Sequence, residues 1–172
     1  PPEPAAPRRI LSIDETPVMN DGAPITVRWC STQLGRNPGL AGIKHLNRLE
    51  QVLARAEWSD VSIAEGLMLD TEGEIVCGTS CNVFAVIDGS LTTPDLRYCG
   101  VAGVMRRQVL SVAAALGIAV NEAPLRPDEL ARASEVFVTN AIAGIRPVGR
   151  LAELEWPIGA TTRRLARALE LW

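Results

Sequence analysis

Lys44 is the residue of this sequence whose type points most directly to chemistry. The chain contains 17 basic residues, and all of them except Lys44 are arginines. An arginine stays protonated, whereas a lysine amine can lose its proton and form a Schiff base with a carbonyl compound. The lone lysine therefore either marks a position that requires an amine nucleophile or is simply one surface lysine that has remained.

The residues next to Lys44 could tune such an amine. The segment 42–50 (GIKHLNRLE) places the only histidine of the chain, His45, directly after the lysine, and Asn47 and Arg48 follow in the next turn. A catalytic amine needs a lowered pKa, which a neighbouring cation can provide. The ordinary polar start of a helix is the alternative interpretation of this segment.

Two further segments carry polar groups or glycines where regular structure is interrupted. Residues 77–84 (CGTSCNVF) combine a glycine, two hydroxyls and an asparagine at a strand break, which suits either a polar ligand or a simple bulge. Residues 99–107 (CGVAGVMRR) follow Thr93-Pro94-Asp95 and place glycines before a helix. Backbone N–H groups at such a helix start can bind an anion, although a turn that needs positive φ would explain the glycines equally well.

Short strands and helices must position these segments. In the first forty residues we expect strands at 8–13 and 25–30, a turn at 20–22 between them, and a polar, Gly-rich loop at 31–41. Apolar residues then recur at helical spacing, and these are Leu46, Leu49, Val52, Leu53 and Ala56. This spacing predicts a helix with Lys44 at its mouth.

The rest of the chain predicts an α+β fold built on a mixed sheet, without internal repeats. A meander of four short strands is expected at 65–70, 75–77, 82–87 and 90–93. Further strands are expected at 118–122, 134–139 and 147–151. Helices are expected at 101–116, from Pro127, and at 159–171.

Length and composition indicate one domain of ordinary size. With 172 residues, 47% of them hydrophobic, and a net charge of −3, the chain has enough apolar residues for a core and no basic patch for nucleic acid. No apolar run is long enough to span a membrane. The Pro-rich residues 1–9 lack the apolar core of a signal peptide and resemble an inter-domain linker. Four cysteines without a CxxC pair favour packed thiols in a reducing cytoplasm over a zinc site.

Taken together, the three segments resemble the fold-type IV pyridoxal-phosphate (PLP) enzymes. This family contains branched-chain aminotransferases, D-amino-acid aminotransferases and aminodeoxychorismate lyases. Residues 40–58 (LAGIKHLNRLEQVLARAEW) and 93–110 (TPDLRYCGVAGVMRRQVL) look most similar to the bacterial lyases of the family. The resemblance runs from about Val27 to the C-terminus. It implies the mixed-sheet C-terminal domain of these enzymes, with their N-terminal domain absent.

The resemblance also implies a role for each segment. Lys44 matches the Schiff-base lysine, and Arg48 matches a polar position near the cofactor ring. Residues of the 77–84 segment match a strand behind the ring, while the helix start and a loop at 139–142 match the phosphate contacts. The implied cofactor-binding residues are Lys44, Arg48, Cys77, Ser80, Cys81, Asn82, Gly103, Val104, Met105, Asn140 and Ala141.

Two features depart from the family pattern. Many relatives carry a glutamate five residues before Asn82, where it pairs with the pyridine nitrogen, but this chain has Cys77. A thiol keeps that nitrogen protonated less well than a carboxylate does, unless it is a thiolate. The family also has an N-terminal domain of roughly one hundred residues. We therefore expect residues 1–30 to be an inter-domain linker with residual strands, and residues 31–172 to be the PLP-binding C-terminal domain.

The function that the resemblance implies is conversion of 4-amino-4-deoxychorismate to 4-aminobenzoate and pyruvate, a step of folate synthesis, with Lys44 as the catalytic residue. It further implies a cytoplasmic homodimer that acts on a small molecule and has neither nucleic-acid nor membrane partners. One alternative is an aminotransferase of the same fold that acts on branched-chain or D-amino acids. The other is an inactive fragment that serves only as a folded or dimer-forming module.

Overall fold

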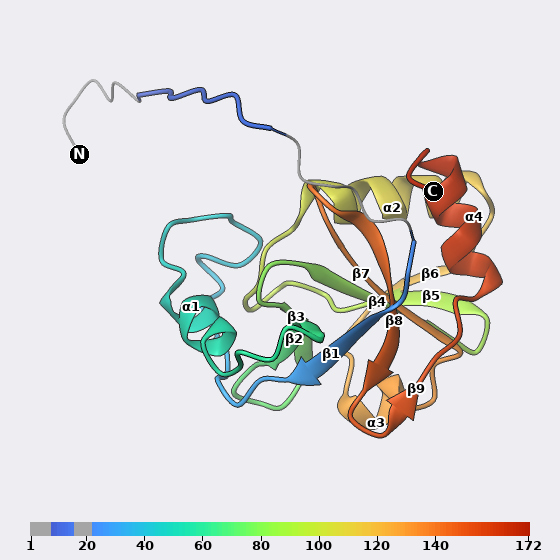
Figure 1. The fold of residues 1–172 in the computed structure, drawn as a ribbon, viewed down its shortest axis with the longest axis horizontal. Helices are drawn as coiled ribbons and strands as arrows, with labels where there is room; N and C mark the ends of the chain where they lie inside the picture. The colour runs from blue at the N-terminus through green and yellow to red at the C-terminus, as the bar shows by residue number, and fades with distance from the viewer. Residues whose placement is uncertain (1–7, 16–21) are drawn as a thin grey trace.

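A mixed β-sheet forms the centre of the computed structural model, which describes residues 8–15 and 22–172 (Figure 1). Within these ranges the strands are β1 (Ile25–Trp29), β2 (Ile63–Leu69), β3 (Ile75–Gly78), β4 (Asn82–Ile87), β5 (Ser90–Thr93), β6 (Val120–Glu122), β7 (Glu135–Asn140), β8 (Gly144–Leu151) and β9 (Leu154–Glu155). The helices are α1 (Leu49–Arg55), α2 (Val104–Ala115), α3 (Pro127–Leu130) and α4 (Ala160–Ala168).

The strands follow the order β3-β2-β1-β8-β7-β4-β5-β6, and β9 pairs with β8. Strand β1 lies parallel to both β2 and β8, and β5 lies parallel to β6. The other neighbouring strands are antiparallel. The expected α+β class with a mixed sheet is therefore confirmed. β1 is central because Val27 pairs with Glu65 of β2 on one side and Leu151 of β8 on the other.

The predicted four-strand meander is wrong in its middle connection. β2–β3 and β4–β5 are antiparallel hairpins, but β2, β1, β8 and β7 lie between β3 and β4 in the sheet. β4 is buried almost throughout as the apolar run NVFAVI, so it needs neighbours on both edges and cover on both faces. It takes β5 and β7 as those neighbours, and the chain leaves β3 through the break at residues 79–81.

The strand predicted at 8–13 is also wrong. Residues 8–15 have no regular structure, and Ile10, Leu11 and Ile13 are almost fully exposed. Strand propensity alone is insufficient there, because a strand needs a neighbouring strand to satisfy its backbone groups. The Pro-rich residues 1–7 and most of the predicted turn at 20–22 lie outside the described residues. No helix in the described ranges is long and apolar enough to cross a membrane.

Helices α2 and α4 lie together over one part of the sheet, and α1 lies far from them, beyond β2 and β3 (Figure 1). Under α2 and α4, the rings of Phe84 and Phe137 stack with centroids 4.9 Å apart. A separate core of buried apolar residues, which includes Trp58 and Cys77, underlies α1. The α1 region is thus held to the sheet by its own small core.

The apolar face predicted for α1 turns away from this core. Helical spacing is correct, but the helix begins only at Leu49, and Leu46, Leu49, Val52 and Leu53 are 100%, 67%, 59% and 54% exposed. The inward face carries Gln51 and Ala54 instead. The orientation of α1 therefore buries a carboxamide that the pattern of apolar residues gave no reason to single out.

Candidate functional site

One cavity of about 350 Å³ collects all eleven residues that the sequence implied for cofactor binding. They come from the loop before α1, the break between β3 and β4, the start of α2, and the turn after β7. The eleven are Lys44, Arg48, Cys77, Ser80, Cys81, Asn82, Gly103, Val104, Met105, Asn140 and Ala141. Segments that are remote in sequence therefore line one cavity. The roles of the individual residues stay predictions.

Five further residues line the same cavity but were not among the implied cofactor-binding residues. They are Gln51, Gly78, Thr79, Val101 and Thr139. Four of them lie inside the segments 77–84, 99–107 and 139–142, so the extent of each motif was the available signal. No sequence signal pointed to Gln51, because its position depends on which face of α1 turns inward.

Backbone hydrogen bonds hold the Lys44 loop against the segment that leads into α2. The Gly42 amide donates to the Gly100 carbonyl at 3.0 Å, and the Ala102 amide donates to the Gly42 carbonyl at 3.0 Å. Gly42 has φ +78°, a conformation that favours glycine, so this close pairing depends on its lack of a side chain. The pairing brings the exposed Lys44 beside the glycine-flanked helix start.

The start of α2 is free to receive an anion. Its N-cap residue, Gly103, makes no side-chain cap hydrogen bond, and the first turn contains no acidic residue. A Cβ on Gly103 would clash with Oδ1 of the buried Asn82, whose Nδ2 donates to the Val101 carbonyl at 2.8 Å. Asn82 thus fixes the turn, and the uncapped amides of a twelve-residue helix favour negative charge at its tip.

Glu65 fixes the cavity wall between β3 and β4. Its carboxylate is 6% exposed and accepts hydrogen bonds from the Gly66 amide (2.8 Å), from the amide and hydroxyl of Thr79 (3.0 and 2.5 Å), and from the amide and hydroxyl of Ser80 (3.3 and 2.7 Å). One buried side chain therefore orders the backbone between Gly78 and Asn82. Its position at the start of a predicted strand gave no sign of this role.

Cys77 faces the cavity as a neutral thiol. Burial raises its pKa to about 12, and the opposing effect of the Arg48 charge is smaller. The side chain is only 4% exposed, in agreement with this cause. The possibility of a thiolate at this position is thereby excluded near neutral pH.

The raised pKa of Cys77 predicts a loss of stability in alkali. Below pH 8 both the folded and the unfolded chain hold the thiol proton, so the titration of Cys77 does not lower the free energy of unfolding. Above that pH the unfolded chain releases its proton first, and folding is penalised until the folded pKa of about 12 is passed. Replacing Cys77 with serine removes this titration.

We expect the free energy of unfolding of the wild type, measured relative to Cys77→Ser, to fall by about 1–2 kcal/mol between pH 8 and pH 10. Urea denaturation at both pH values measures this difference, and a constant difference would contradict the assignment.

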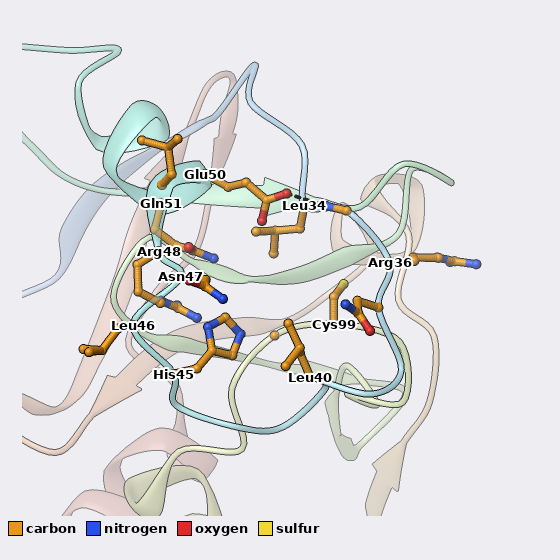
Figure 2. A pocket seen from close by; sticks show the side chains of 14 residues that line it. Leu34, Arg36, Leu40, His45, Leu46, Asn47, Arg48, Glu50, Gln51 and Cys99 are labelled. Atoms are coloured by element: carbon orange, nitrogen blue, oxygen red, sulfur yellow. Dashed lines mark hydrogen bonds between the residues drawn. The ribbon is translucent and has the colours of Figure 1, made fainter. Parts of the chain in front are cut away.

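A second cavity, of about 540 Å³, adjoins the first, because Arg48 and Gln51 line both. Its walls come from the loop at 34–40, the segment 45–51, and Cys99 with Gly100. Figure 2 shows the imidazole of His45 directed into this space, with Leu40 and Cys99 nearby. Lys44 does not line it.

The first cavity suits a ligand that carries both a carbonyl group and a phosphate. An amine stands beside an uncapped helix tip, and the volume lies within the usual range for small-molecule sites. Among the described residues, no group of three or more His, Cys, Asp and Glu side chains could hold a metal ion. All four cysteines are unpaired.

Comparison with known proteins gives a consistent pattern. The "Amino-transferase class IV" family matches residues 2–151. The aminodeoxychorismate lyase of Vibrio harveyi is 41% identical over 140 residues, which are 79% of this chain and 52% of that protein. The branched-chain-amino-acid aminotransferase of Escherichia coli K12 is 34% identical over 125 residues, which are 71% of this chain and 40% of that protein.

Solved structures show the same likeness. The 4-amino-4-deoxychorismate lyase of Pseudomonas aeruginosa superposes with a TM-score of 0.84 at 50% identity, covering 86% of this chain and 54% of that one. The branched-chain aminotransferase of Thermobaculum terrenum, solved in its PLP form, gives 0.79 at 26% identity, covering 87% and 51%. The chain spans about half the length of the relatives it matches.

Proposed function

The chain belongs to the class IV aminotransferase family, and from that premise we propose that it is the PLP-binding part of an aminodeoxychorismate lyase. The reaction is conversion of 4-amino-4-deoxychorismate to 4-aminobenzoate and pyruvate. The observation that carries the proposal is the placement of the single lysine beside the uncapped start of α2, in one cavity with all the matched residues. The 41% and 50% identities to two lyases favour this member of the family.

Each part of the cavity has a distinct task in this proposal. The Val104 and Met105 amides would hold the cofactor phosphate, with Asn140 and Ala141 beside it. Arg48 and the wall at residues 80–82 would line the space for the ring. When bound, PLP supplies an electron sink for breaking bonds at the substrate. With the cofactor bound, the Lys44 amine would be its covalent attachment point, and the freed amine would hold and move the proton during loss of pyruvate.

Reduction with borohydride tests the Schiff base directly. The protein is incubated with PLP, reduced, digested with trypsin and mapped by mass spectrometry. A modified Lys44 resists trypsin, so residues 37–48 (NPGLAGIKHLNR) appear as one pyridoxyl-bearing peptide instead of splitting after the lysine. Labelling of the N-terminal amine alone, with an intact cleavage after Lys44, would refute the assignment.

The neutral Cys77 favours elimination over amino transfer. A thiol does not hold a proton on the pyridine nitrogen as a carboxylate would, and loss of pyruvate tolerates a weaker electron sink better than transamination does. In Cys77→Glu we expect a changed cofactor absorption spectrum and amino transfer raised about tenfold, which corresponds to about 1.4 kcal/mol. Cys77→Gln is the control, because it has the same size without the charge. Identical spectra and rates in wild type and Cys77→Glu would contradict the idea.

An aminotransferase of the same fold is the second candidate, favoured by the 34% identity to a branched-chain enzyme. The two activities separate in one assay that follows 4-aminobenzoate release and amino transfer from branched-chain or D-amino acids in parallel. If PLP leaves no label on Lys44 and neither activity appears, the chain acts as a non-enzymatic module.

The assembly and location are proposed with the same function. We propose that residues 31–172 are the PLP-binding domain of a cytoplasmic homodimer and that residues 1–30 are the linker before it, of which only β1 joins the sheet among the described residues. Four unpaired thiols fit a reducing compartment. Sedimentation at several protein concentrations measures the mass of the assembly, and a monomer at micromolar concentration would contradict the dimer.

A further inference from the structure

The second cavity contains buried polar atoms without partners. Gln51 is only 7% exposed, and its Oε1 atom is buried without a hydrogen bond among the described residues. The Nδ1 atom of His45 is likewise buried and unpaired in that part of the chain. Both residues line the cavity. Because buried polar groups in native proteins nearly always have partners, these two atoms indicate that a ligand supplies partners for them. The His45 nitrogen, when it carries the ring proton, needs an acceptor, whereas the Gln51 oxygen needs a donor such as an amine. Gln51 also lines the Lys44 cavity, so its two partners can come from different parts of one ligand.

The charges around the cavity indicate what kind of ligand fits. Arg36 is already committed, since its Nε donates to Asp70 at 2.8 Å and its Nη2 donates to Glu74 at 2.7 Å. The Glu50 carboxylate accepts the Gly35 amide at 2.9 Å. Arg48, in contrast, makes no ion pair with any described residue. The Arg48 guanidinium is therefore available to pair with an anionic group of a ligand in this cavity.

Neutral donors and apolar surface complete the lining. Asn47 and Gln51 provide carboxamide N–H groups, and the His45 ring can present an N–H on its buried nitrogen. Leu34 and Leu40 add apolar surface (Figure 2). The Glu50 carboxylate is directed to the Gly35 amide, which leaves the Arg48 cation, several neutral donors and an apolar wall for the ligand. These features match a single carboxylate on an apolar stem.

We propose that this second cavity recognises a carboxylate of the substrate while the substrate amine lies in the Lys44 cavity. The proposal rests on the proposed function only for the identity of the substrate, 4-amino-4-deoxychorismate, which carries its amine and two carboxylates on one small frame. Arg48 and Gln51 line both cavities, so their side chains can contact both ends of one small ligand. His45 lines the second cavity alone, which makes it the diagnostic residue.

Binding of 4-aminobenzoate and of its neutral analogue 4-aminobenzamide to the PLP-loaded protein tests the proposal. Calorimetry should show the acid binding at least about tenfold more tightly than the amide, because only the acid pairs with Arg48. His45→Ala and Gln51→Leu should each weaken the acid about tenfold and change the amide less than about twofold. Gln108→Leu, the same change at an exposed position of α2, should change neither.

Thermal stability without ligand gives a second readout. Gln51→Leu removes an unpaired buried oxygen, so we expect the melting temperature to rise by about 2–4 °C even as acid binding weakens. A fall in melting temperature would show that the carboxamide serves the fold and would count against the proposal. Equal affinity for acid and amide, or full affinity in His45→Ala, would overturn it.

These outcomes are separable from the fate of the proposed reaction, because binding requires no turnover. If the wild type prefers the acid and depends on His45 but releases no 4-aminobenzoate, the lyase activity is refuted and the carboxylate site is supported. If the wild type releases 4-aminobenzoate while His45→Ala retains full affinity for the acid, the lyase activity is supported and the carboxylate site is refuted.

Discussion

Replacing Lys44 with arginine should lower kcat for 4-aminobenzoate release by at least about a thousandfold while leaving the fold intact. Arginine keeps the positive charge and most of the length, but it stays protonated and cannot form the Schiff base. Because Lys44 is exposed, the free energy of unfolding should change by less than about 0.5 kcal/mol. Steady-state kinetics and urea denaturation of the same preparation measure both effects.

Because the chain has a single lysine, a control variant can restore the lysine content at a different position. Arg163 is exposed on α4 and does not line the cavity, so Lys44→Arg/Arg163→Lys restores the lysine content without restoring its position. This double variant should remain as inactive as Lys44→Arg. If Lys44→Arg retained a tenth of the wild-type rate, the amine would not be the catalytic group.

Replacing Glu65 with leucine should cost about 3–5 kcal/mol of stability and abolish PLP binding. The change leaves the amides and hydroxyls of Thr79 and Ser80 without their acceptor, in a wall of the Lys44 cavity. Glu65→Gln keeps one acceptor oxygen and should cost less, about 1–2 kcal/mol. Urea denaturation measures the stability, and the visible absorption of added PLP measures the binding.

Glu57 offers a matched control for Glu65. Its carboxylate accepts hydrogen bonds from the Ser31 amide (2.8 Å) and from the amide and hydroxyl of Thr32 (2.8 and 2.7 Å), so it also holds a Ser/Thr turn. It does not line the Lys44 cavity. Glu57→Leu should therefore destabilise the chain without changing the PLP affinity. If both variants lose PLP affinity in proportion to their loss of unfolding free energy, Glu65 stabilises the fold and has no specific role at the cavity.

Local chemistry in the sequence was sufficient to identify the parts of the site. Lys44 stands out because it is the single lysine, and the glycines before α2 stand out because they precede a helix. Both features can be recognised from a few neighbouring residues. The resemblance then identified eleven residues that the structure brings to one cavity. Most strands and helices were also expected near their observed places, since their apolar spacing is local.

Long-range packing decided what local patterns could not. Partner choice in a sheet depends on burial on both faces, which is why β4 pairs with β7 and not with β3. The same competition for burial turned Gln51 inward and left Leu49 exposed.

The sequence alone determined which residues can do chemistry in this protein: one amine, one glycine-flanked helix start, and the Cys77 thiol at a strand break. Tertiary structure decided how those residues act. The charge of Cys77 depends on its burial, and the wall at residues 79–82 depends on the carboxylate of Glu65. Protonation and orientation are properties of the surroundings that folding creates, so they appear only once distant segments have been packed together.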